Sequence, residues 1–496
     1  MKYKWFLYIP FLLLFAAHAI VFQGCRDDDY LDLSYMNLSF SSDTVLFDTV
    51  FTTIGSATKQ LKVYNNHDER IRISSVELGG GASSYYRINV DGEPGHTIYD
   101  VDIEANDSIS IFAEVTLDPV NQDLPYVITD SLIFRSNTDK QIVKLVAWGQ
   151  DAIFIRPNQE IIFDKDTIKG HLIDENTTWT GNLPYVLFGN VVVEPGATLT
   201  VEEGANIHIF NDVNIVFRPG SMFKVKGSIE EKVFIEGFRL EEYYRERHGQ
   251  WGRIWFMAGS YDHEIKNAVI KNGTIGLHVD SIGSNTSPTL KLENTFIRNM
   301  SFYGILAMGS HIVGQNVVVS DCGEHTAVFQ HGGKYDFRHS TFANYYNVSI
   351  RQTPSIKLNN YEFVDGNRLT RDLEKAYFGN CIIYGNLEEE ILYDFNQGVG
   401  EANYIFDHSI LKTNRDVSDN NNYINVLKNE YPLFYDVSEN DYRLHEDSPA
   451  IDAGNEDVSE NIIYDILGNS RADRADIGAY QYHEIDEEDE QDKWDE

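Results

Sequence analysis

Asn267-Ala-Val-Ile-Lys-Asn272 sets a pattern to which five later hexapeptides align without gaps. They are Asn294-Thr-Phe-Ile-Arg-Asn299, Asn316-Val-Val-Val-Ser-Asp321, His339-Ser-Thr-Phe-Ala-Asn344, Asn380-Cys-Ile-Ile-Tyr-Gly385 and His408-Ser-Ile-Leu-Lys-Thr413. Their starts lie 27, 22, 23, 41 and 28 residues apart. Repeats of this length predict a stack of parallel β-helix coils, with one large insertion near residues 351–377.

The second and fourth residues of each hexapeptide are expected to point into the coil, because side chains two apart share one face of a strand. The second residue is small and the fourth is larger and apolar, so each should form a stacked column. The first residue, Asn or His, either bonds to its equivalents in neighbouring coils or only forms a turn. Both alternatives predict the same fold.

A shorter repeat precedes these hexapeptides. Residues 193–201, 201–209 and 217–225 each close a short strand with a glycine turn. Trp251-Gly-Arg-Ile-Trp-Phe256 is similar to the opening strand of such coils, and Ser448-Pro-Ala-Ile-Asp-Ala-Gly454 with Asp476-Ile-Gly-Ala-Tyr480 to the closing segment of bacterial β-helix surface proteins. Residues 186–482 therefore resemble right-handed parallel β-helix proteins of the pectin-lyase-like class.

Residues 36–150 alternate apolar and polar side chains in short runs separated by turn signals. This pattern predicts a β-sandwich with strands near residues 58–64, 71–73, 108–112, 131–134 and 141–146. The segment resembles Hydin-like immunoglobulin-like domains, and residues 151–185 are expected to connect it to the β-helix. The predicted fold class is all-β: an immunoglobulin-like β-sandwich followed by a right-handed parallel β-helix.

The N-terminus has a basic start, an apolar run and a small residue before Cys25, which is typical of a signal peptide over residues 1–24. It resembles a bacterial lipoprotein signal, which implies that Cys25 is the lipid-attachment residue. The next residues resemble the surface-export signal of Bacteroidetes lipoproteins: Arg26, Asp27, Asp28 and Asp29. A cleaved secretory peptide with an incidental cysteine is the alternative. Residues 25–35 are predicted to be an acidic tether, and residues 483–496 an acidic disordered tail.

Composition limits the partners. The formal charge of −37 argues against binding to nucleic acid or to an anionic bilayer surface. Cys322 and Cys381 fall in the predicted coils, where we expect free thiols. No cofactor or metal is expected, because the spacing of His325, His331 and His339 matches no zinc motif and the Asp416 region lacks the EF-hand pattern.

Lys271 and Arg298 occupy the fifth position of successive coils, so their charges should lie close together. The resemblance implies that such a lysine or arginine abstracts a proton beside a uronate in β-helix polysaccharide lyases. Crowding of two cations would make Lys271 a better base. The alternative is a solvated pair of charges.

Residues 238–251 insert aromatic and basic residues between coils. Aromatic faces with guanidinium groups could bind a sugar ring that carries a carboxylate. The alternative is a short amphipathic helix that caps the first coils. The candidate ligand-binding residues are Arg239, Tyr243, Tyr244, Arg245, Arg247 and Trp251.

The third position of the hexapeptides forms an apolar outward stripe that something should cover. Its members are Val269, Phe296, Val318, Thr341, Ile382 and Ile410. The cover is either the chain itself, through residues 351–377 or the sandwich, or a partner protein. We favour the chain itself.

Six Asp-Ser/Thr-apolar tripeptides resemble the Bacteroidetes O-glycosylation sequon, although Asp-Ser/Thr before an apolar residue can simply open a strand. The candidate glycan-bearing residues are Thr44, Thr49, Ser108, Ser131, Thr167 and Ser281.

These observations predict a lipid-anchored protein of the outer membrane, exposed at the cell surface. It would present its β-helix to a glycan or an outer-membrane protein without catalysis. Two alternatives stay open: a polysaccharide lyase or glycosidase acting on an acidic glycan, and a non-catalytic subunit of an outer-membrane assembly.

Overall fold

The computed structural model describes residues 38–118, 126–136, 139–163, 166–281, 287–472 and 474–484. The predicted signal peptide, Cys25, the export residues 26–29, the tether and residues 485–496 of the predicted tail lie outside the described residues. Within the described ranges, no helix is both long and apolar enough to cross a membrane. The chain forms two compact units, with the change from one to the other between Gln150 and Asp151.

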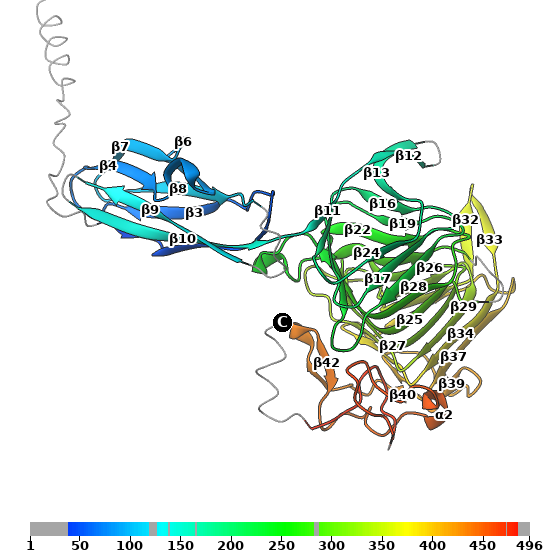
Figure 1. Ribbon diagram of the computed structural model, residues 1–496. Helices are drawn as coiled ribbons and strands as arrows, with labels where there is room; N and C mark the ends of the chain where they lie inside the picture. The colour runs from blue at the N-terminus through cyan, green and yellow to red at the C-terminus, as the bar shows by residue number, and fades with distance from the viewer. Residues whose placement is uncertain are drawn as a thin grey trace, which may run out of the picture. The chain divides into compact units, whose positions relative to one another are not determined.

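The first unit is a β-sandwich of two five-stranded sheets (Figure 1). One sheet has the order β1-β3-β8-β5-β6, with β1 (Ser39–Phe40), β3 (Lys59–Tyr64), β8 (Ser108–Val115), β5 (Tyr86–Val90) and β6 (Glu93–Gly95). The other has the order β2-β10-β9-β4-β7, with β2 (Thr44–Phe51), β10 (Lys140–Gln150), β9 (Tyr126–Arg135), β4 (Ile71–Leu78) and β7 (Thr97–Ile103). Alternation places Leu61, Val63, Ile73, Ile111 and Leu132 in the core between the sheets.

The second unit stacks parallel strands in two large sheets, as the coils of a parallel β-helix require. The ten-stranded sheet contains β12 (Gln159–Phe163), β13 (Asp166–Ile173), β16 (Asn190–Val193), β19 (Ile215–Phe217), β22 (Trp251–Phe256), β24 (Gly273–Val279), β26 (Tyr303–Met308), β28 (Ala327–Gln330), β31 (Ile356–Asn359) and β36 (Ile391–Asp394). Only its first pair, β12 with β13, is antiparallel.

The eighteen-stranded sheet covers the other faces of the coils. Its strands are β11 (Ile153–Ile155), β14 (Thr177–Trp179), β15 (Tyr185–Leu187), β17 (Thr198–Glu202), β18 (Asn206–Ile209), β20 (Met222–Lys226), β21 (Val233–Gly237), β23 (His263–Lys271), β25 (Leu290–Met300), β27 (His311–Cys322), β29 (Gly333–Arg338), β30 (Thr341–Asn344), β34 (Leu373–Gly379), β35 (Ile382–Gly385), β37 (Ala402–Asp407), β38 (Ile410–Leu411), β39 (Tyr423–Ile424) and β40 (Leu427–Lys428). The predicted all-β fold class, a β-sandwich followed by a parallel β-helix, is confirmed. Because β11 pairs with β15, the stack already begins in the region 151–185, where a connecting segment was expected.

The predicted columns of the hexapeptides are present. Ile270, Ile297, Val319, Phe342, Ile383 and Leu411 follow one another in register and are fully buried. The small second-position residues, among them Ala268, Thr295 and Val317, form the parallel column beside them. Cys322 and Cys381 are free thiols buried in the same core.

The C-terminal segment, defined here as residues 434–482, covers the apolar outward stripe. It contains the short pair β41 (Phe434–Asp436) and β42 (Asp441–Leu444) and the helical turn α2 (Glu456–Ser459), and lies against the coils in Figure 1. Val318, Ile382 and Ile410 form one buried cluster with residues of this segment, including Tyr442, Ile466 and Ile477. The chain therefore covers its own stripe, as favoured, but the predicted covering segment was wrong. Residues 351–377 instead hold β31, the start of β34 and the hairpin β32 (Tyr361–Val364) and β33 (Asn367–Thr370).

The insertion of residues 238–250, called here the 238–250 loop, is not the amphipathic helix considered from the sequence. Its regular structure is a single 3₁₀ turn, Glu242–Tyr244. The loop lies over the side of the coils at Lys271, Arg298 and Asn299 rather than over their first edge, because Glu246 contacts all three residues.

Candidate functional site

Two arginine–tyrosine pairs project from the 238–250 loop. The guanidinium carbon of Arg239 lies 4.1 Å from the ring centre of Tyr244, and that of Arg247 lies 4.1 Å from the ring centre of Tyr243. The two tyrosine rings meet edge to face at 5.0 Å. Tyr243 is 65% exposed, so this cluster presents aromatic surface to solvent. Arg239 is paired with Glu241 at 2.6 Å, so the cation that accompanies this surface is Arg247. The sequence predicted these four residues as ligand-binding candidates, and the structure brings them together.

The other two predicted binding residues have different positions. Arg245 lies 3.8 Å from the carboxylate of Glu242, its neighbour in the 3₁₀ turn. Trp251 is buried in the coil core, where its indole nitrogen donates to the backbone oxygen of Lys271 at 2.8 Å. Trp251 is therefore a packing residue and not part of the exposed cluster.

Four phenylalanines line a corner of the coils next to this loop. Phe188, Phe210 and Phe238 each follow a strand of successive coils, with ring centres 5.4 Å and 5.3 Å apart along the row. Phe154 continues the row beyond Phe188 at 6.0 Å. The guanidinium of Arg156 lies 5.2 Å from the ring centre of Phe188. This corner row, which ends at the first residue of the 238–250 loop, was not predicted, although Phe188, Phe210 and Phe238 recur 22 and 28 residues apart, which is the spacing of the coils.

Glu246 fixes the loop to the coils. One of its carboxylate oxygens lies 3.2 Å from the Lys271 ammonium and 3.4 Å from the Arg298 guanidinium. The other accepts a hydrogen bond from the Asn299 side chain. Although burial opposes its ionisation, Arg298 and Lys271 hold the pKa of Glu246 below its usual range. The loop thus gains an ionic anchor at the base of the two arginine–tyrosine pairs.

Lys271 and Arg298 lie opposite each other in β23 and β25, as the sequence predicted, but they are not a solvated pair, because one oxygen of Glu246 contacts both. The Lys271 side chain is only 7% exposed and also lies 3.2 Å from the carboxylate of Glu236 in β21. Two carboxylates therefore surround this one ammonium. A lysine in this arrangement would have to break both ion pairs before it could remove a proton from a substrate. The interpretation of Lys271 as a lyase base is not supported by this geometry.

Asp321 is the residue after Ser320, which pairs with Arg298 in the next coil, and it has a different environment. Its carboxylate accepts a hydrogen bond from the Tyr442 hydroxyl at 2.6 Å, and its backbone oxygen lies 3.1 Å from His248 of the loop. Burial raises the pKa of Asp321 to about 6, against the hydrogen bond from Tyr442 and the charge of Arg298. Glu246 and Asp321 are thus two neighbouring carboxyl groups whose pKa values are shifted in opposite directions. Neither pKa shift was predicted, because the contacts that cause the shifts join residues far apart in the sequence.

The six candidate glycosylation residues are all at least partly exposed. Thr44 and Ser108 begin β2 and β8, and the apolar residues that follow them, Val45 and Ile109, are buried. Asp107 and Asp130 accept hydrogen bonds from the backbone N–H groups of Ser108 and Ser131, each at 2.7 Å. Thr44 and Ser108 therefore do open strands, whereas Thr49 and Ser131 lie within β2 and β9. Glycosylation of the six residues stays a prediction.

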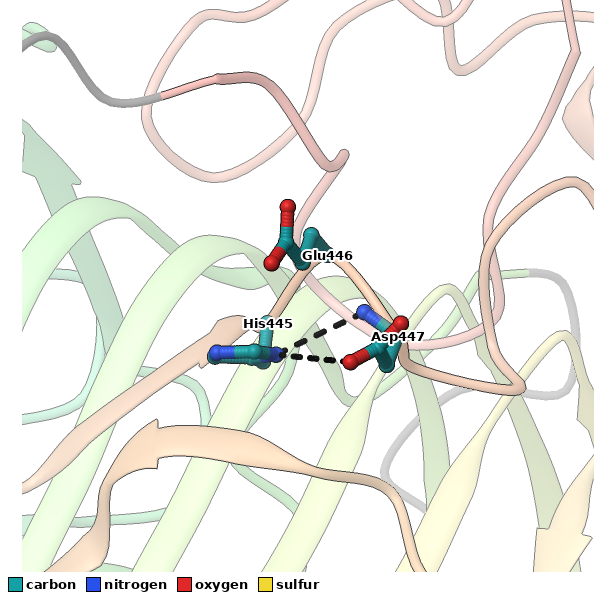
Figure 2. Close-up of side chains that lie close together, drawn as sticks. All are labelled: His445, Glu446 and Asp447. Atoms are coloured by element: carbon teal, nitrogen blue, oxygen red, sulfur yellow. Dashed lines mark hydrogen bonds and ion pairs between the residues drawn. The ribbon is translucent and has the colours of Figure 1, made fainter.

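His445, Glu446 and Asp447 bring three ligand-type atoms within 4.8 Å of one another in an exposed turn (Figure 2). His445 Nδ1 lies 4.0 Å from the Asp447 carboxylate. Three consecutive exposed side chains do not make the closed ligand set of a structural metal site, and we assign no metal to them. Asp416 and Asp419 each accept from backbone N–H groups two residues ahead, at 3.0 Å, which is a local turn geometry.

No protein-family model matches the chain, and no curated protein matches it. A family 123 glycoside hydrolase from Clostridium perfringens shares 8% identity over 24% of this chain and 30% of that protein, with a TM-score of 0.18. The catalytic unit of a GH87 alpha-1,3-glucanase from Streptomyces thermodiastaticus shares 10% identity over 71% of this chain and 79% of that protein, with a TM-score of 0.25. A protein from Porphyromonas gingivalis W83 shares 12% identity over 27% of this chain and 78% of that one, with a TM-score of 0.17.

Proposed function

We propose that this protein is a lipid-anchored glycan-binding protein of the cell envelope, held in the outer membrane through Cys25 and exposed at the cell surface. Its β-helix serves as a rigid support for the aromatic and basic cluster of the 238–250 loop. The observation that carries the proposal is the exposed pair of Tyr243 and Arg247, set on a loop that Glu246 fixes to the coils.

The chemistry of this cluster favours a glycan with carboxylate groups. Arginine presents a planar fork of donors that matches a carboxylate, and tyrosine offers a flat ring to the apolar face of a sugar. The corner row of Phe154, Phe188, Phe210 and Phe238 continues the aromatic surface over several coils. An extended acidic polysaccharide could contact both parts along the axis of the stack. The chain's overall charge of −37 makes such binding dependent on local contacts rather than on long-range attraction.

Binding is preferred over catalysis because the candidate base is occupied. Lys271 is buried between Glu236 and Glu246, and Glu246 is itself bonded to Arg298 and Asn299. Each charged group in this network has partners within the protein. These ion pairs explain why the loop is held in this position, and they do not require a catalytic role for Lys271.

The test is binding of the full chain to polygalacturonate, measured by affinity electrophoresis and calorimetry. We expect Tyr243→Ala with Arg247→Ala to weaken binding by about tenfold or more, because two anchor side chains are removed. Arg247→Lys keeps the charge but removes the fork, and should also weaken it. Tyr99→Ala is the matched control, since Tyr99 is 70% exposed on the sandwich. Failure of the wild-type chain to bind, or equal binding by the double variant, would overturn the proposal.

A second candidate function, glycoside hydrolysis, is favoured by one observation: Glu246 has a lowered pKa and neighbouring Asp321 a pKa raised to about 6. Glycosidases use one ionised and one protonated carboxyl group in this way. Release of reducing ends from a polysaccharide panel, abolished by both Glu246→Gln and Asp321→Asn, would establish it. Absence of product from every polymer that the chain binds would leave binding as the function.

A further inference from the structure

The outer face of the β1-β3-β8-β5-β6 sheet of the sandwich contains a cavity of about 360 Å³. It lies in the first unit, apart from the residues that carry the proposed function. Phe112, Arg87, Asn89, Pro94, His96 and Glu114 contribute to its lining. From this cavity we infer a second binding site, one for a neutral saccharide.

The alternation of β8 places Phe112 in the cavity. Ile111 and Ala113 are buried in the sandwich core, so the side chain between them points to the opposite face. Phe112 is 41% exposed there. Its phenyl ring is therefore available as a flat apolar surface for a ligand rather than as core packing.

The register of the sheet places a hydrogen-bonding group of the cavity beside this ring. Phe112 pairs with Asn89 of β5, which lines the cavity, and on the other side with Gln60 of β3, whose amide donates to the Ser110 hydroxyl at 2.8 Å. The Asn89 carboxamide oxygen accepts from the backbone N–H of Gly92 at 2.8 Å, which orients the amide. An aromatic face beside an oriented amide matches a sugar ring, whose apolar face can stack while its hydroxyl groups bond at the edge.

The charged residues of the cavity indicate a neutral ligand. Arg87 and Glu114 lie directly opposite each other in the sheet, 3.7 Å apart, with side chains 66% and 44% exposed. So exposed a pair contributes little to stability. Its opposite charges offset each other, while both groups can exchange hydrogen bonds with hydroxyls. This differs from the 238–250 loop, where the guanidinium of Arg247 favours an anionic sugar.

A peptide added as an extra strand is a less suitable occupant. The neighbouring edge strand, β6, has three residues with Pro94 in the middle. Proline has no backbone N–H to donate, and a short edge strand offers few bonds to an added strand. The cavity opens on the face of the sheet, where side chains rather than backbone groups would contact the ligand.

The experiment screens the full chain against a panel of neutral gluco-, manno- and galacto-oligosaccharides by calorimetry. We expect at least one to bind, and Phe112→Ala to weaken that binding about tenfold or more. Asn89→Ala should weaken it as well, and thermal unfolding of both variants shows whether the sandwich stays folded.

Two controls separate this site from the other surfaces. Tyr99→Ala changes an aromatic on the opposite sheet that is more exposed than Phe112, and this variant should bind as the wild type does. The Tyr243→Ala, Arg247→Ala double variant should also retain binding of the neutral ligand. If no oligosaccharide binds, if Phe112→Ala binds unchanged, or if only the 238–250 double variant loses binding, the inference is wrong.

Discussion

Asn267 and its equivalents have two structural roles. Each forms a bend of the coil, and several bond to the equivalent residue of a neighbouring coil. Asn267, Asn294, Asn316, His339, Asn380 and His408 all have positive φ values, between 45° and 53°. Asparagine tolerates this conformation better than most residues, and it bends the coil there. The Asn294 amide also donates to Asn267 at 3.0 Å and accepts from Asn316 at 2.9 Å. The turn and the ladder, which were alternatives in the sequence, are both present.

Substitution of Asn294 separates the two contributions. Asn294→Gly keeps the positive φ but removes both ladder bonds, and should cost about 1–3 kcal/mol of stability. Asn294→Ala should cost about 1 kcal/mol more than Asn294→Gly, because the Cβ of alanine disfavours the left-handed conformation that glycine adopts freely. Urea unfolding measures both values. A glycine variant as stable as the wild type would show that the ladder bonds contribute nothing.

Asp321 should make stability depend on pH. Its pKa is about 6 in the folded chain, above about 3.9 for an unfolded aspartate. Folding thus favours the protonated form. The contribution of Asp321 to the free energy of unfolding is therefore complete below about pH 4 and is lost as the pH rises through 6. Relative to Asp321→Asn, the free energy of unfolding of the wild type should fall by about 2–3 kcal/mol between pH 4 and pH 7.

The measurement for Asp321 is urea unfolding of both proteins across that pH range. Asp436→Asn is the control, because hydrogen bonds from Ser438 hold the pKa of that exposed carboxyl below its usual range. The difference in stability between the wild type and Asp436→Asn should show no fall of this kind, because both proteins keep Asp321. A constant difference between wild type and Asp321→Asn would contradict the burial of an ionisable carboxyl.

At the scale of elements, the main relation is between the coil strands and the C-terminal segment. Ile382 in β35 is fully buried by this segment, and the Ala479 N–H donates to the Thr341 hydroxyl at 3.1 Å. Tyr442 adds its bond to Asp321. The apolar stripe therefore supports internal packing. This stripe was the feature that suggested a subunit of an outer-membrane assembly, and its burial within the chain removes that reason.

Ile382→Asp should release the C-terminal segment. The variant places an unpaired charge among apolar side chains, at an expected cost above about 3 kcal/mol. Limited proteolysis should then cut within residues 434–482, while far-UV circular dichroism still reports β-structure. Leu392→Asp, at a residue that is 38% exposed in β36, should change neither readout. Resistance of the Ile382 variant to proteolysis would argue against the packing described here.

At the scale of the molecule, each unit has a core of its own. The sandwich core centres on residues such as Phe47, and the coil core on stacked rings such as Phe337, Phe378 and Phe406. Phe337 and Phe378 stack at 5.9 Å, and Phe378 and Phe406 at 5.2 Å. Contacts in a solenoid run mainly between neighbouring coils, whereas the sandwich closes on itself.

Two unfolding transitions are therefore expected in calorimetry. Phe47→Ala should lower the temperature of only one transition, and Phe378→Ala that of only the other. Each variant should lose about 3–5 kcal/mol of stability in its own unit. Both residues are at most 1% exposed, so the two variants are matched in burial. A single transition shifted by both variants would show that the units unfold together.

The sequence by itself determined the coil architecture, its inner columns and the sites of its bends. It could do so because strand alternation and coil stacking repeat locally, so that Ile270 and its equivalents appear at fixed places in each hexapeptide. It also identified the arginine–tyrosine cluster, whose members are close together in the chain. Only the tertiary structure decided that residues 434–482 cover the stripe and that Glu236 and Glu246 enclose Lys271. These contacts join segments with no common period, and burial and charge at each residue depend on which segments meet.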